Sequence, residues 1–176
     1  MNKSMLVVVA LLLFPGASSQ AQRPQDSESV QLYAAVLQDM PDVAKNREIA
    51  VDPRLSASFA EGAKIMDVWE QHLSRSESSP VVGLLRQRVP GIRVCPETAA
   101  RSSCLRTADA VHVTFSAPVL DDSTATVEAT FITRTSDDSD SFDVQTWQYS
   151  FVMTPQGPAS RGRELLARGH GRVGKN

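Results

Sequence analysis

The sequence predicts an α+β fold in which two to three N-terminal helices pack on a C-terminal curved antiparallel sheet of three to five strands. Apolar residues recur at helical spacing in the first half of the chain and alternate with polar residues in the second half. Polar and proline-containing breaks separate these segments. Because the helices come first and the strands last, we expect the helices to cover one face of the sheet.

The beginning of the chain matches a secretory signal peptide. Lys3 precedes an apolar run, Leu6 to Phe14, and small or polar residues follow as far as Ala21. The run is too short to span a bilayer, which needs about 20 apolar residues. We therefore expect cleavage near Ala21, a secreted or periplasmic protein, and no membrane anchor.

The remaining chain has the length of one domain. A hydrophobic content of 41% supports a folded core, and a net charge of -2 argues against a nucleic-acid-binding protein. The predicted organisation is a signal peptide at 1–21, a flexible leader at 22–27, a single α+β domain at 28–168 and a flexible basic tail at 169–176.

Three helices are predicted in the first half. The first is capped by Ser27 and ends before Pro41, and a second begins with the Ser-x-x-Glu capping pattern of Ser58 and Glu61. A third begins at Pro80 and ends before Pro90. The apolar positions that predict these helices are Val30, Tyr33, Ala34 and Leu37, then Phe59, Met66, Trp69 and Leu73, and then Val81, Leu84 and Leu85.

The strands of the second half follow from period-2 alternation. An extended piece, Glu48 to Val51, comes earlier and leads into the turn Asp52-Pro53. The predicted strands are centred on Val111, Val113 and Phe115, then on Ala125, Val127, Ala129 and Phe131, then on Phe142 to Thr154, with a last edge strand at Glu164 to Arg168.

This element order, with a hairpin before the long aromatic strand Phe142 to Thr154, resembles the NTF2-like and cystatin-like α+β cone folds. The resemblance implies a pocket between the helices and the concave face of the sheet. In such folds the pocket binds a ligand, carries acid–base catalysis in a few enzymes, or mediates dimerisation. The fold therefore does not select a function.

His112 is the candidate catalytic residue, because an imidazole can act as an acid or base near neutral pH. Alternation places it opposite Val111 and Val113, so we expect it on a solvated face or against a partner. Catalysis would need a carboxylate within hydrogen-bond reach, such as Glu128 or Asp143. The other interpretation is a structural histidine.

Cys95 and Cys104 are the two cysteines, and we expect them to form a disulfide in an oxidising compartment. Their spacing does not match the Cys-x-x-Cys motif of thioredoxins, and the scattered histidines do not support a zinc site. The acidic run Asp137 to Asp143 could supply calcium ligands, but it lacks the EF-hand pattern and is interpreted as a hairpin loop. No metal site is predicted.

Two further features could contact a partner or ligand. The aromatic residues Trp69, Trp147, Tyr149 and Phe151 could line a pocket for a small apolar ligand, although an ordinary sheet core needs the same residues. The basic C-terminal residues, from Arg161 to Lys175, could meet an acidic surface, but they include no aromatic side chain that could stack on nucleic-acid bases.

Nucleotide-binding, nucleophile-elbow and zinc-protease motifs do not occur, so no cofactor is expected. The sequence thus favours an exported, non-enzymatic domain that binds a small apolar ligand or a protein partner. A small acid–base enzyme using His112 and a carboxylate is the alternative, and an interaction module with exposed sheet edges is a third possibility.

Overall fold

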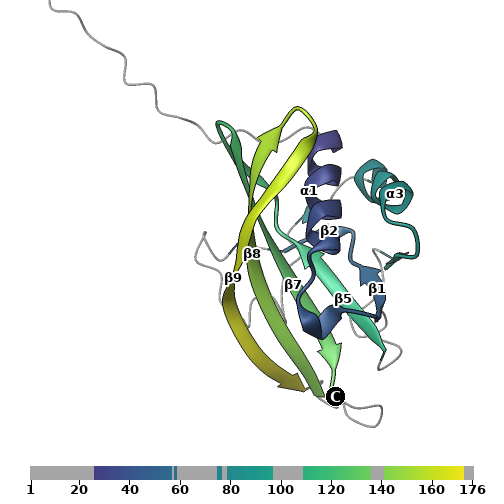
Figure 1. The fold of residues 1–176 in the computed structure, drawn as a ribbon. Helices are drawn as coiled ribbons and strands as arrows, with labels where there is room; N and C mark the ends of the chain where they lie inside the picture. The colour runs from purple at the N-terminus through teal and green to yellow at the C-terminus, as the bar shows by residue number, and fades with distance from the viewer. Residues whose placement is uncertain are drawn as a thin grey trace, which may run out of the picture.

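The computed structural model describes residues 26–56, 58, 75–76, 79–96, 109–135 and 141–172. The predicted signal peptide and most of the second predicted helix, with Trp69, lie outside these residues. The elements are α1 (Asp26–Gln38), the 3-10 helix η1 (Asp42–Ala44), β1 (Glu48–Val51), β2 (Arg54–Leu55), β3 (Arg75–Ser76), α3 (Ser79–Arg88), β4 (Arg93–Val94), β5 (Ala110–Phe115), β6 (Val119–Asp121), β7 (Thr124–Arg134), β8 (Ser141–Thr154) and β9 (Gly157–Arg172) (Figure 1).

Seven of these strands form one mixed sheet. The strand order is β4-β1-β5-β7-β8-β9, and β6 pairs with β7. Strand β1 runs parallel to both β4 and β5, whereas the other neighbours are antiparallel. Strands β2 and β3 form a separate antiparallel pair. The longest strands, β7, β8 and β9, therefore occupy one half of the sheet, and β9 lies at its end.

The predicted fold class is wrong. In place of two to three helices packed on a sheet of three to five antiparallel strands, the described residues are 56% strand and 21% helix and include a mixed seven-stranded sheet. The extended piece predicted at Glu48 to Val51 is confirmed as β1, whereas the two residues of β4 are too few to show alternation. Their parallel pairing also joins segments far apart in the chain, which local periodicity cannot show.

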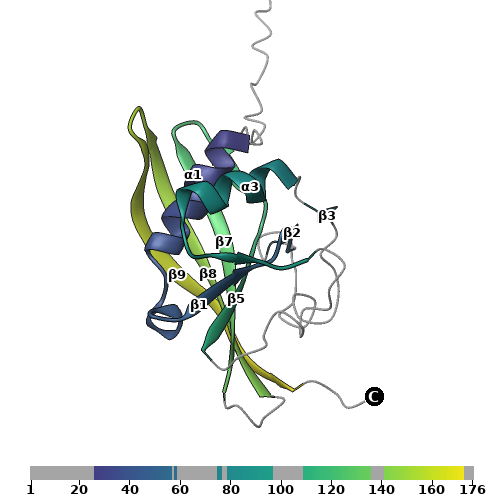
Figure 2. The ribbon, with the colours of Figure 1, turned by 90° about the vertical axis from the view of Figure 1, so that its right-hand side faces the viewer.

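Helix α1 packs against β7 and β9 on one side and against α3 on the other (Figures 1 and 2). Because α1 lies between the sheet and α3, its buried residues are not confined to one face of the helix. The buried set is Ser29, Val30, Leu32, Tyr33, Ala34, Val36 and Leu37. Helix α3 adds Val81 and Leu85 to the same hydrophobic core.

The core lies between α1 and the face of the sheet formed by alternate residues of β5, β7 and β8. Tyr33 stacks on Phe115 with ring centroids 4.4 Å apart, and its hydroxyl donates a hydrogen bond to the carbonyl of Ser116 at 3.2 Å. Phe131 and Tyr149 belong to the same core cluster. The predicted inward faces of these strands are thus the faces that α1 covers.

Strand β9 is longer than the sequence pattern suggests. It pairs with β8 from Gly157 to Arg172, so the strand includes residues 169–172, which the sequence predicts to be part of a flexible basic tail. Two register shifts interrupt the pairing, and Gly162, next to one of them, has a φ of 138° that side chains rarely adopt. Because β9 is an edge strand, it does not need apolar side chains facing the core along its whole length. The alternation of apolar and polar residues in its sequence is therefore weak.

We expect Phe131→Ala to lower the free energy of unfolding by about 3–5 kcal/mol, because it leaves a cavity at the centre of the core. The exposed fraction of Phe131 is 1%. Val119→Ala is the control, since Val119 is 45% exposed and its truncation should cost less than about 0.5 kcal/mol. Urea unfolding of both variants measures the difference, and similar losses would contradict the assignment of Phe131 to the core.

Candidate buried polar site

The face of the sheet opposite α1 is buried and polar at its centre. Residues that alternate with the apolar core positions of β5, β7 and β8 are at most 4% exposed. They are His112, Thr114 and Ser116 on β5 and at its end, Glu128 and Thr130 on β7, and Thr146 on β8. The expectation that His112 lies on a solvated face is therefore wrong, because both faces of β5 are covered.

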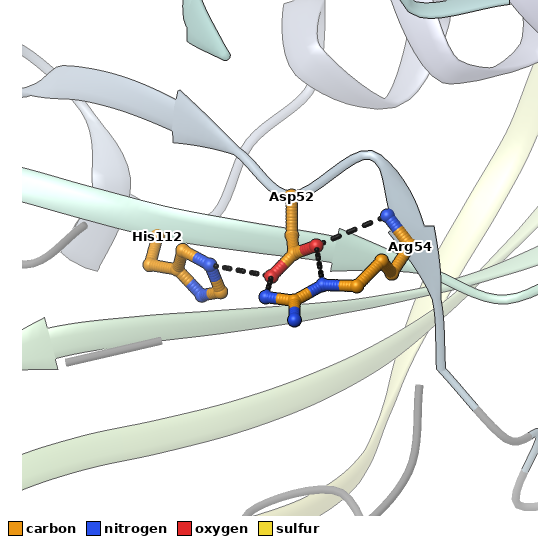
Figure 3. A network of polar contacts seen from close by, with 3 residues as sticks. All are labelled: Asp52, Arg54 and His112. Carbon is orange, nitrogen blue, oxygen red and sulfur yellow. Dashed lines mark hydrogen bonds and ion pairs between the residues drawn. The ribbon is translucent and has the colours of Figure 1, made fainter. Parts of the chain in front are cut away.

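Asp52 forms the centre of an ion-pair network with His112 and Arg54 (Figure 3). The Nε2 atom of His112 lies 3.2 Å from Oδ2 of Asp52. The guanidinium of Arg54 donates through Nε to Oδ1 and through Nη2 to Oδ2, both at 2.8 Å. The backbone N–H of Arg54 also donates to Oδ1 at 3.0 Å. Both carboxylate oxygens therefore have two neighbouring nitrogen atoms each.

The backbone brings these three residues together. Ala50 on β1 is the register partner of His112 on β5, and the N–H of Asp52 donates to the carbonyl of Val113 at 2.9 Å. Asp52 follows β1 directly, and Pro53 turns the chain so that Arg54 comes back over the carboxylate. The parallel junction between β1 and β5 thus positions the network.

The electrostatics of the network favour an ionised Asp52. Burial raises the pKa of this carboxyl, but hydrogen bonds from His112 and Arg54 outweigh burial and hold the pKa well below its ordinary value. The side chains of Asp52 and His112 are 0% exposed and that of Arg54 is 20% exposed. A carboxylate that is buried and accepts hydrogen bonds on both oxygens orients the groups around it and is a poor proton acceptor.

The carboxylates proposed from sequence as partners of His112 lie elsewhere. Glu128 is on the same face but four residues along the paired strands, about 13 Å at 3.3 Å per residue. Its Oε1 accepts a hydrogen bond from the hydroxyl of Ser58 at 2.8 Å. Asp143 lies on the opposite face and forms an ion pair with His170 of β9. The partner of His112 in the structure is Asp52, which the sequence pattern predicts only as a turn residue.

Other buried polar groups on this face are only partly satisfied. The hydroxyls of Thr130 and Thr146 lie 2.9 Å apart, and Ser116 Oγ accepts from the N–H of Glu128 at 3.0 Å. Within the part of the chain that the structure describes, Thr114 Oγ1 has no hydrogen-bond partner. Between the described residues, the contacts on this face are therefore short local pairs.

The aromatic residues proposed as ligand contacts belong mainly to the core. Tyr149 and Phe151 are 0% and 1% exposed, and the Tyr149 hydroxyl donates to the carbonyl of Asp39 at 3.2 Å. Trp147 is half-buried, with its indole N–H bonded to Gln145 and the guanidinium of Arg163 5.2 Å from its ring centroid. Only Trp147 of the three thus has surface for a partner; Trp69 is outside the described residues.

The cysteine and metal predictions concern residues that are only partly described. Cys95 is 2% exposed and packs with Ala50, while Cys104 lies outside the described residues. Their disulfide stays a prediction. Most of the acidic run at 137–143 is also outside, and the described residues contain no cluster of three or more metal-ligating side chains.

Comparison of the chain with protein-family models, curated proteins and solved structures gives no match. The resemblance to NTF2-like and cystatin-like cones therefore stays a prediction. In the described part of the chain, no helix combines the length and apolar character needed to cross a membrane.

We expect Asp52→Asn to lower the free energy of unfolding at pH 7 by about 3 kcal/mol, because the substitution breaks a buried ion pair. The pKa of Asp52 is lower in the folded than in the unfolded protein. Its contribution to the free energy of unfolding is therefore complete above the unfolded-state pKa of about 4, and is lost as the pH falls toward the folded-state pKa. The wild-type advantage over the variant should therefore shrink as the pH falls below 4.

Urea unfolding from pH 7 down to pH 2 measures this dependence. Asp42→Asn is the matched control, because Asp42 also pairs with a cation, Lys45, but its side chain is 91% exposed. The control should leave stability nearly unchanged. Equal effects of the two substitutions would contradict a stabilising role for the buried network.

Proposed function

We propose that this protein is an exported, non-catalytic binding domain that takes up an extended segment of a partner protein at the open edge of β9. The observation that carries the proposal is the position and length of β9, a strand from Gly157 to Arg172 at the end of the sheet. An edge strand presents unpaired N–H and C=O groups, which can hydrogen-bond an added strand.

The exposure of β9 supports this role. Among the described elements, β9 pairs with β8 alone. Helix α1 contacts β9, but many residues of the strand remain exposed to solvent. The residues of β9 classed as exposed are Ala159, Ser160, Arg161, Gly162, Glu164, Leu165, Arg168 and His170. The opposite end of the sheet, β4, has only two residues and offers a much shorter template.

The buried site supports a binding role over catalysis. A general acid or base must reach the proton that it transfers, and the side chain of His112 is 0% exposed. Its neighbour Asp52 already accepts hydrogen bonds from Arg54 on both oxygens. Export, inferred from the first 21 residues, is part of the same proposal, since it places the partner outside the cytoplasm.

Two ten-residue peptides test the proposal, one alternating valine with glutamate and the other alternating valine with glutamine. We expect at least one to protect from hydrogen exchange those β9 amides that point away from β8, because the added strand would hydrogen-bond them. Leu165→Ser should weaken binding about 5-fold by removing an apolar contact. Val119→Ser, at a similarly exposed position, is the control. No protection of β9 at millimolar peptide would overturn the proposal.

A second candidate function, acid–base catalysis, is favoured by the 3.2 Å contact between His112 Nε2 and Asp52 Oδ2. It requires that small molecules reach His112. We expect diethylpyrocarbonate to modify His170, whose side chain is 73% exposed, and to spare His112 until the protein unfolds. Peptide mass spectrometry locates the modified residues. Modification of His112 at a rate close to that of His170 would favour the enzyme.

A further inference from the structure

We infer that the segment bound at β9 is acidic, with carboxylates that pair with Arg161 and Arg168 around an apolar contact at Leu165. The inference rests on the proposed function and adds the chemistry of the partner. Cross-strand neighbours of opposite charge stabilise paired strands, so the side chains of β9 determine which strand fits beside it.

The charge of β9 is strongly one-sided. Its sequence contains four arginines and one histidine but a single acid, Glu164. Arg163 is already committed, because its guanidinium donates to the carbonyl and the carboxylate of Asp39 at the end of α1. His170 pairs with Asp143. Arg161 and Arg168 are exposed and form no ion pair with any residue that the structure describes.

An apolar surface lies between Arg161, which falls at the register shift beside Ser150, and Arg168, which pairs with Gln145. Leu165 is paired with Trp147, and Arg163 with Tyr149, so the four side chains lie on the side of the sheet that carries α1. Leu165 is 42% exposed and Trp147 is half-buried beneath the guanidinium of Arg163. An alternating segment with both apolar and acidic side chains would match this surface.

The surface is open because α1 ends beside it. The carbonyl of Asp39, directly after α1, accepts hydrogen bonds from Tyr149 and Arg163, so the helix terminates at the level of this strand pair. Strands β8 and β9 continue past that point toward residues 141 and 172 (Figure 1). Leu165 and Arg168 lie on the continuing part and are not covered by the helix.

A second copy of the same strand fits this edge less well. Antiparallel pairing of two β9 strands would bring two arginine-rich rows together with only one glutamate in each. Like charges on adjacent strands are destabilising, and charge on an edge strand is a known way of preventing self-association. An acidic partner removes this repulsion.

Fluorescence anisotropy of labelled peptides tests the inference. The valine–glutamate peptide should bind at least 10-fold more tightly than the valine–glutamine peptide, and its affinity should fall as salt is raised from 50 to 300 mM. Arg161→Glu with Arg168→Glu should weaken binding of the glutamate peptide at least 10-fold. Arg86→Glu with Arg88→Glu, an equal charge change on exposed positions of α3, should change it less than 2-fold.

The outcomes separate this inference from the proposed function. If both peptides protect β9 amides with equal affinity, the edge binds a strand but the acidic preference is wrong. If neither protects β9, both proposals fail. Equal losses in the two double variants would show a general charge effect and overturn the inference. A dimer seen by sedimentation, with protected β9 amides in the protein alone, would identify a second copy as the occupant.

Discussion

The burial of both faces of the central strands is the constraint on which the rest of the structure depends. All six residues of β5 are buried, and so are seven successive residues of β7. One face is apolar and packs against α1, whereas the other carries histidine, threonine and glutamate side chains. Each of these polar groups has lost water, so it must find a partner inside the protein or destabilise the fold. The network of Asp52, Arg54 and His112 pairs both oxygens of the buried Asp52 carboxylate and ties β1 and β2 to β5.

The long hairpin of β8 and β9 is stabilised differently. It gains little from burial along β9 and relies on a long antiparallel ladder with β8, which two register shifts interrupt. Two side chains also attach it to the helical layer, where Tyr149 and Arg163 donate hydrogen bonds to the carbonyl of Asp39. A cation at this position also complements the negative end of the α1 dipole. The attachment holds one half of the hairpin under the helix and leaves the other half without cover.

The sequence predicts the elements better than their assembly. The spacing of Val30, Tyr33 and Leu37 identifies α1, and alternation identifies the buried faces of β5, β7 and β8, because these residues follow one local period. The extended segment of β1 was predicted, but the mixed sheet was not, since β4 is too short for a pattern and the parallel partners of β1 are distant in the chain. His112 could be selected as a titratable residue in a strand, but its partner could not. Asp52 becomes a neighbour of His112 only through the pairing of Ala50 with His112.

The chemistry of the two regions supports different roles for them. Catalysis needs groups that exchange protons with a substrate, whereas the carboxylate of Asp52 is paired on both oxygens and the side chains of Asp52 and His112 are 0% exposed. Such an arrangement contributes to stability and to the register of β1 against β5. The edge of β9 has different properties: among the described elements it pairs with β8 alone, and Arg161, Arg168 and Leu165 are exposed. A strand that has hydrogen bonds still to form can add another strand, and this difference between the two regions supports the proposal of a binding role for β9.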